Sequence, residues 1–156
     1  TSVIGGSGYF DGSGDYLSFS ISENFSFGTG NFCVELFIYP TSTAYYATPI
    51  SFGGEFGLIT YPDASKMAVV DWTGAVIVAD PNAIPVNQWS HVAVVRNAGT
   101  LTLYVNGVAK ASAANSTNFS NNSTNYVGSW MSVGNYTPIG AINVMPNRCC
   151  CLCIGD

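Results

Sequence analysis

Two alternating segments, "SHVAVVRN" (residues 90–97) and "TLTLYVNG" (residues 100–107), constrain this chain most strongly. Apolar residues that recur at every second position mark a β-strand with two different faces. Gly99 lies in the short connection and readily takes the positive φ that tight hairpin turns require. The segments therefore predict a β-hairpin. One face of its first strand carries Trp89, His91, Ala93 and Val95, and the other carries Val92, Val94 and Arg96.

Short β-rich runs of the same kind recur along the chain, separated by Gly, Asn, Asp and Pro, while no useful length shows helical periodicity. About a dozen short strands with almost no helix predict an all-β fold, with two antiparallel sheets packed as a jelly-roll sandwich. The predicted strands are Gly8–Phe10, Tyr16–Ser20, 31–40, Thr48–Phe52, Phe56–Tyr61, Met67–Trp72, Ala75–Ala79, Trp89–Arg96, Leu101–Asn106, Val108–Ser112, Tyr126–Val133 and Ala141–Val144.

Charge is scarce, since hydrophobic residues make up 47% of the chain and charged residues only 8%. Soluble intracellular monomers usually rely on surface charge, so we expect an extracellular or assembled setting. No run approaches the roughly 20 apolar residues of a membrane-spanning helix, so no membrane insertion is expected. The net charge is −5 with four Lys and Arg residues, which argues against nucleic acid as a partner. The chain begins at Thr1 without a signal-peptide pattern, as expected of a processed product or a piece of a longer chain.

Three segments resemble laminin G-like domains of the concanavalin A-like lectin/glucanase superfamily. "QWSHVAVVRNAGTLTLYVNGV" (88–108) is similar to their hallmark hairpin, and "GGSGYFDGSGDYLSF" (5–19) and "FSFGTGNFCVELFIYP" (25–40) look like their first strands. Phe37 stands where the family usually has Trp. The resemblance covers roughly residues 7–143 and implies a concanavalin A-like sandwich. Such domains occur in secreted adhesins, in sugar-binding modules and in virion surface proteins, and this chain's Lys-poor style looks most like the virion examples.

The C-terminal end departs from the family pattern. There, an "IG" motif leads into a closing strand, and here "TPIGAINVMPNRCCCLCIGD" (137–156) stands in its place. We therefore divide the chain into a sandwich (1–143) and an atypical Cys-rich tail (144–156). We expect the closing strand to come from this tail, from another subunit, or not at all.

The tail cysteines are Cys149, Cys150, Cys151 and Cys153. Three consecutive cysteines do not readily converge on one tetrahedral zinc ion, so no metal site is assigned to them. Disulfides within the tail, with Cys33 or between subunits would suit an extracellular assembly. A divergent or frameshifted tail explains the same residues equally well.

Catalysis has little support in the sequence, and we assign no catalytic residue. His91 could act as a general base only beside a nucleophile or carboxylate, and its same-face neighbours along the strand offer neither. The resemblance also implies a structural His91 in the hairpin. Glu35 and Glu55 each lack an acidic neighbour nearby in the sequence, whereas retaining glycosidases need two carboxyl groups about 5 Å apart. A glucanase-related enzyme is therefore the least favoured alternative.

Aromatic residues in or near predicted loops are candidates for sugar stacking, although core or interface packing would use them equally well. They are Tyr45, Tyr46, Trp72 and Trp130. Calcium stays open as a cofactor without an assigned ligand set, because some relatives bind it at the rim of the sandwich. The available carboxylates are Asp63, Asp71, Asp80 and the Asp11/Asp15 pair. The polar stretch 115–125 predicts an exposed loop with glycosylation sequons at Asn115, Asn118 and Asn121.

These features predict a non-enzymatic structural and adhesive module of a virion or extracellular surface. Its partners would be copies of itself, a larger scaffold or surface glycans. A carbohydrate-binding lectin module of a secreted protein is the alternative.

Overall fold

The computed structural model describes residues 7–21, 25–42, 47–53, 55–60, 66–120, 122–130 and 139–144. None of the helical turns within these ranges is long and apolar enough to cross a membrane. The described part holds twelve strands. They are β1 (Gly8–Asp11), β2 (Leu17–Phe19), β3 (Phe32–Pro40), β4 (Ile50–Phe52), β5 (Phe56–Thr60), β6 (Lys66–Asp71), β7 (Val76–Ala83), β8 (Ser90–Asn97), β9 (Thr100–Val105), β10 (Val108–Ala114), β11 (Asn125–Val127) and β12 (Ile139–Val144).

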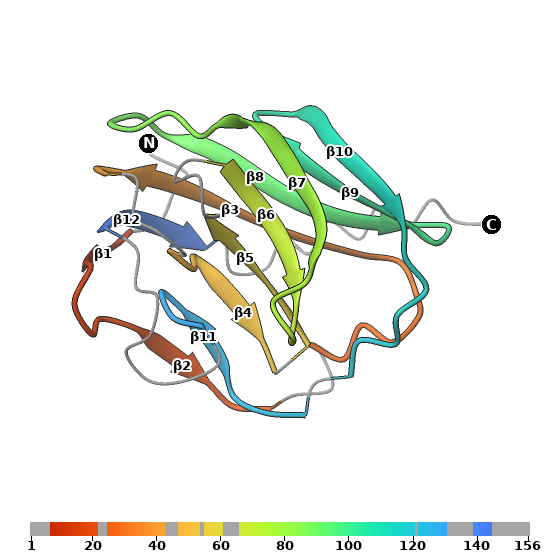
Figure 1. Cartoon of the computed structure of the whole chain (residues 1–156). Helices are drawn as coiled ribbons and strands as arrows, with labels where there is room; N and C mark the ends of the chain where they lie inside the picture. The colour runs from red at the N-terminus through yellow and green to blue at the C-terminus, as the bar shows by residue number, and fades with distance from the viewer. Residues whose placement is uncertain are drawn as a thin grey trace, which may run out of the picture.

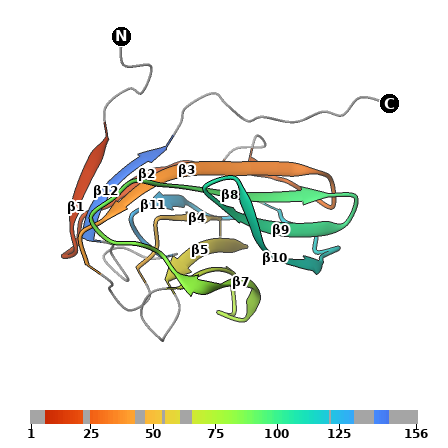
Figure 2. The same ribbon diagram turned by 90° about the horizontal axis from the view of Figure 1, so that it is seen from above.

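The strands form two antiparallel sheets. Sheet A has the order β1-β12-β3-β8-β9-β10, and sheet B has the order β2-β11-β4-β5-β6-β7. Figure 1 shows the two sheets, and in the view from above β3 and β8 lie in one layer and β5 and β7 in the other (Figure 2). The predicted hairpin is β8–β9, with Asn97 opposite Thr100 and a positive φ at Gly99. The structure thus confirms the predicted all-β sandwich.

The core lies between the sheets and takes its side chains from alternate strand positions. Several core residues of both sheets are at most 1% exposed. They include Leu36, Val92 and Leu103 of sheet A and Leu58 and Val69 of sheet B. Burial of each such side chain stabilises the fold by roughly 1.5–3 kcal/mol. β3 also alternates, because its other set of residues is half-buried on the outer face of sheet A. That set is Cys33, Glu35, Phe37 and Tyr39.

Arg96 is the largest fully buried side chain of the described residues. Its guanidinium lies about 5 Å from the ring centres of Phe32 and Phe119, and it donates hydrogen bonds to two loops. The acceptors are the carbonyls of Gly28 (2.6 Å), Gly30 (2.8 Å) and Thr117 (2.6 Å) and the Asn115 amide oxygen (3.1 Å). Burial lowers the pKa of Arg96 from its ordinary value, because desolvation disfavours the charged form. Arg96 therefore ties the loop before β3 to the loop after β10.

Of the sources considered for the closing strand, the chain itself provides it, and the strand predicted at Ala141–Val144 is part of it. Residues of the chain itself form β12, which lies between β1 and β3 and pairs with both. Ile142 fits the required pattern, since it is opposite Ile38 and buried in the core. The departure from the family pattern therefore begins after this strand, and no donated strand is needed to fill the position.

The polar stretch 115–125 is also less exposed than its composition predicts. Phe119 is buried and forms a bridge with Gly28, with backbone hydrogen bonds in both directions. Asn125 is fully buried and its amide donates to carbonyls near the end of β2. The stretch thus closes one end of the sandwich, because a single apolar residue within it enters the core.

Candidate functional site

A pocket of about 320 Å³ lies on the outer face of sheet B. This volume is at the lower end of the range for small-molecule sites, about 300–1,000 Å³. We call it the indole pocket, because two of its lining residues are tryptophans. Its lining consists of Thr48, Ile59, Val70, Trp72, Thr73, Gly74 and Trp130. Two of the four aromatic residues predicted to contact a ligand, Trp72 and Trp130, therefore meet at one site.

Trp72 lies in the tight turn between β6 and β7 and is 65% exposed. Asp71 fixes this turn, because its carboxylate accepts hydrogen bonds from the Thr73 amide (2.9 Å), the Thr73 hydroxyl (2.6 Å) and the Ala75 amide (3.0 Å). Gly74 supplies the positive φ (84°) that closes the turn. The turn thus presents a large aromatic surface to solvent on a backbone that is already ordered.

Trp130 reaches the pocket from the segment after β11. A hydrogen bond from the Ser51 hydroxyl to the Ser129 carbonyl (2.9 Å) holds this segment against β4. The indole lies over Gly57 of β5, where a Cβ atom would come within 2.6 Å of the ring and 2.9 Å of the Ile50 carbonyl oxygen. Only glycine leaves room for the indole here, so Gly57 determines where Trp130 sits.

The pocket floor is apolar. Ile59 and Val70 are buried together with Ala68 on the outer face of sheet B, and Trp130 packs against them. Thr48 lines the pocket from a fully buried position, and the segment before β4 is fixed there by a hydrogen bond from the amide of Thr60 to the carbonyl of Ala47 (2.8 Å). An apolar floor, two indoles and threonine side chains form a surface suited to the apolar face of a sugar ring.

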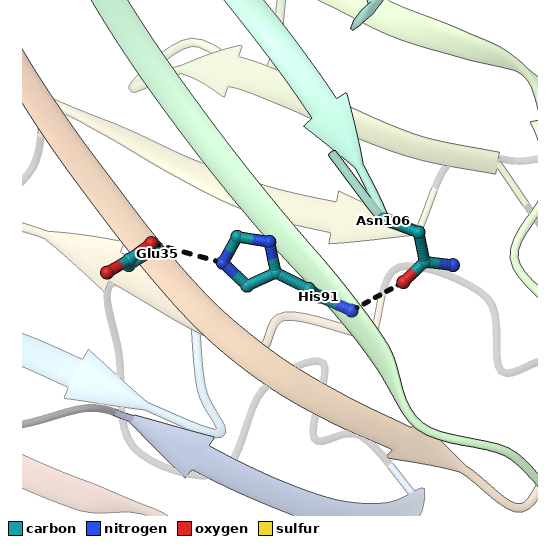
Figure 3. Close-up of polar contacts among 3 residues, drawn as sticks. All are labelled: Glu35, His91 and Asn106. Carbon is teal, nitrogen blue, oxygen red and sulfur yellow. Dashed lines mark hydrogen bonds and ion pairs between the residues drawn. The ribbon is translucent and has the colours of Figure 1, made fainter. Parts of the chain in front are cut away.

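A second polar feature lies on the outer face of sheet A. The imidazole Nε2 of His91 is 3.1 Å from a carboxylate oxygen of Glu35, as Figure 3 shows. The amide of His91 donates to the side-chain oxygen of Asn106 (2.9 Å), and the Phe37 ring lies beside the imidazole with the centroids 4.9 Å apart. The sequence argument that His91 has no carboxylate partner is therefore wrong, because β3 and β8 are neighbours.

The pair nevertheless does not form a two-carboxylate site in the part of the chain that the structure describes. Apart from Glu35, the described carboxylates belong to sheet B, its flanking loops or the Asp11–Asp15 turn. Glu55 accepts hydrogen bonds from Ser120 (3.2 Å) and Asn122 (2.9 Å) in that separate region. The observed geometry gives His91 a structural partner across the strands, in keeping with its predicted role in the hairpin.

The described carboxylates considered for calcium accept hydrogen bonds from backbone amides nearby in the sequence. Asp11 accepts from the Ser13 amide (2.7 Å), Asp15 accepts from the Asp11 amide (3.0 Å), and buried Asp80 accepts from the Asn82 amide (2.9 Å). Among the described residues, no group of three or more His, Cys, Asp or Glu side chains is placed to hold a metal ion. Asp63 lies outside them, and calcium binding stays a prediction.

Several predicted residues lie outside the described ranges, namely Tyr45, Tyr46, Asn121, Cys149, Cys150, Cys151 and Cys153. Of the described sequons, Asn118 is exposed, whereas Asn115 is 8% exposed and its side chain is bonded to Arg96. A glycan on Asn115 would require this contact to open. Sequence reasoning missed the glycine under Trp130 and the Glu35–His91 contact, because each joins strands distant in the sequence.

Comparison with known proteins assigns the chain to a family. A laminin G-type model of the concanavalin A-like lectin/glucanase superfamily matches residues 11–142, whereas no curated protein matches the chain. A candidate carbohydrate-binding protein from Bacteroides ovatus is 19% identical with a TM-score of 0.72 over 89% of this chain, which spans 42% of that protein.

Two further solved structures share the fold. The CBM40 module of a Ruminococcus gnavus sialidase, bound to α2,3-sialyllactose, is 13% identical with a TM-score of 0.66, covering 92% of this chain and 94% of its own. Mouse laminin α1 domains LG4–5 are 15% identical with a TM-score of 0.61, covering 91% of this chain and 40% of their own. At such identities the likeness concerns the fold alone. The family model covers most of the sandwich, and the chain belongs to the concanavalin A-like lectin/glucanase superfamily.

Proposed function

We propose that this protein is a non-enzymatic adhesive module that binds surface glycans through the indole pocket. The observation that carries the proposal is the meeting of Trp72 and Trp130 above an apolar floor. Indole faces stack on the apolar faces of sugars, and the ordered turn limits the entropy lost on binding. Tyr45 and Tyr46 precede the pocket residue Thr48 closely in the sequence, so we include them in the proposed site.

The setting we propose is the outside of a virion or of an extracellular assembly. Low charge and a Ser-, Thr- and Asn-rich surface support it. Membership of a superfamily that includes lectins supports the glycan-binding part of the proposal. The enzymatic alternative is less well supported, because the Glu35–His91 pair has no second carboxylate on its strands among the described residues.

Glycan-array screening followed by calorimetry tests the proposal. We expect the chain to bind at least one saccharide, and Trp72→Ala to weaken that binding about fivefold or more, since stacking of a planar ring such as a nucleobase on one aromatic side chain is worth roughly 1–3 kcal/mol. Trp89→Ala is the matched control, because Trp89 is also exposed but lies outside the pocket, next to Tyr39. Loss of binding in both variants, or in neither, would count against the indole pocket as the site.

Self-assembly is a second candidate, favoured by the aromatic outer face of sheet A. Tyr9 is 65% exposed and Trp89 is 47% exposed there, beside half-buried Phe37 and Tyr39. Copies of the chain would cover this face, and the tail cysteines would cross-link them. Light scattering after size-exclusion chromatography, with and without reductant, measures this directly. A monomer under both conditions would contradict it.

A further inference from the structure

The indole pocket contains no ionisable side chain among its lining residues. The nearest carboxylate along the chain is Asp71, and it already accepts three hydrogen bonds from the turn that carries Trp72. Its charge remains beside the pocket rim. An anionic group that entered the pocket would therefore approach a carboxylate and would meet no cation.

The chain has only four Lys and Arg residues, and the three that the structure describes are not among the residues that line the pocket. Arg96 is buried between Phe32 and Phe119, and Lys110 belongs to β10 of the other sheet. Lys66 begins β6, four positions before the lining residue Val70, which corresponds to roughly 13 Å along the strand at 3.3–3.4 Å per residue. Arg148 lies outside the described residues.

The sequence next to the pocket adds no cation either. The stretches 43–46, 61–65 and 131–138 adjoin described strands or lining residues in the sequence, and none of them contains Lys or Arg. Carboxylate and sulfate groups are commonly recognised by Arg, whose planar fork of donors forms two charge-assisted hydrogen bonds with them. Without such a partner, an anionic group would lose its hydration shell on entering the pocket and would gain no compensating contact.

We propose that the indole pocket takes an uncharged saccharide and rejects sialylated, uronic or sulfated ones. This inference rests on the proposed glycan-binding function and adds the ligand class. A sugar ring stacks on Trp72 or Trp130, and its hydroxyls meet the exposed Thr73 at the rim. The Thr73 hydroxyl donates its proton to Asp71 (2.6 Å), so it faces the ligand as an acceptor and favours sugar hydroxyls over anionic oxygens.

The experiment compares matched glycans that differ only in charge, such as lactose with 3′-sialyllactose and a neutral disaccharide with its sulfated form. We expect every saccharide that binds to lose at least about tenfold in affinity when an anionic group is added within the pocket. We also expect this ratio to persist at 0.5 M NaCl, because the cause is local desolvation. A ratio that vanished with salt would trace the preference to the overall net charge of −5 and would overturn the proposal.

The variant Thr73→Lys provides a gain-of-function arm, because it adds the missing cation at the rim. We expect it to raise the affinity for the sialylated or sulfated member relative to the neutral one. Equal or tighter binding of the charged member to the unaltered chain, abolished by Trp72→Ala, would overturn the uncharged-ligand assignment alone. A chain that binds none of the glycans would overturn the glycan-binding function, and this assignment with it.

Discussion

Arg96 shows how a single residue can organise the ends of several strands. The alternation of β8 predicts that Arg96 shares a face with Val92 and Val94, and the structure shows that this face is buried. It does not predict which groups contact the guanidinium, because the acceptors are loop carbonyls 66 and 68 positions earlier and 21 positions later in the chain. Among the described residues, no carboxylate pairs with this buried guanidinium. Carbonyl dipoles and the faces of two phenylalanine rings stabilise it instead.

Replacement of Arg96 by Met should lower the free energy of unfolding by about 3–5 kcal/mol, because several buried carbonyls would lose their donor. Urea denaturation followed by tryptophan fluorescence measures this. Arg96→Lys should lower the free energy of unfolding by most of the same amount, since an ammonium group lacks the planar fork of donors. Lys110→Met on β10 is the control and should change stability by less than about 1 kcal/mol. A similar small effect at both positions would disprove the anchoring role of Arg96.

At the scale of elements, the positions of strands and turns could be predicted from the sequence, but which strands lie side by side could not. The sequence predicts strands ending at Trp72 and beginning at Ala75, and the observed turn lies between Asp71 and Val76. The pocket itself depends on the segment after β11 lying across β5, and no local pattern indicates which strands are adjacent. The same limit explains why Glu35, two positions from the residue opposite His91, was not recognised as its partner.

Asp71→Ala tests whether the turn is ordered in advance of binding. Removal of its carboxylate takes away three acceptor contacts, so we expect stability to fall by about 1 kcal/mol. We expect saccharide affinity to fall roughly three- to tenfold, because binding would then have to order the turn. Asp11→Ala, which alters a similar turn between β1 and β2, should leave calorimetric affinity unchanged. An unchanged affinity in Asp71→Ala would argue that the turn does not position Trp72.

For the whole molecule, the sandwich was predictable because about a dozen alternating runs admit few architectures. The division into a sandwich of residues 1–143 and a tail of residues 144–156 stays a prediction, and β12 ends at Val144. The last strand was predicted at Ala141–Val144, but its place in the sheet was left open. The structure shows that it contributes buried Ile142 to the core and joins β1 to β3.

Two truncations separate the sandwich from the Cys-rich tail. A chain ending at Val144 should melt cooperatively, with a midpoint within roughly 3 °C of the full chain, because the twelve strands described remain. A chain ending at 138 should show no cooperative transition, since sheet A loses the strand between β1 and β3. Circular dichroism on heating records both. A large drop for the first truncation would assign the tail to the folded core.

The pairing of the first described strand with the last has a further consequence for the architecture of larger proteins. Gly8 lies opposite Ile142, so the chain enters and leaves the sandwich at the same end of one sheet. Adjacent strands are about 4.8 Å apart. A domain built in this way can be inserted into a surface loop of a host protein while the two ends of the interrupted loop stay close together. Its opposite outer faces, one with the indole pocket and one with exposed aromatic rings, would then both project from the host.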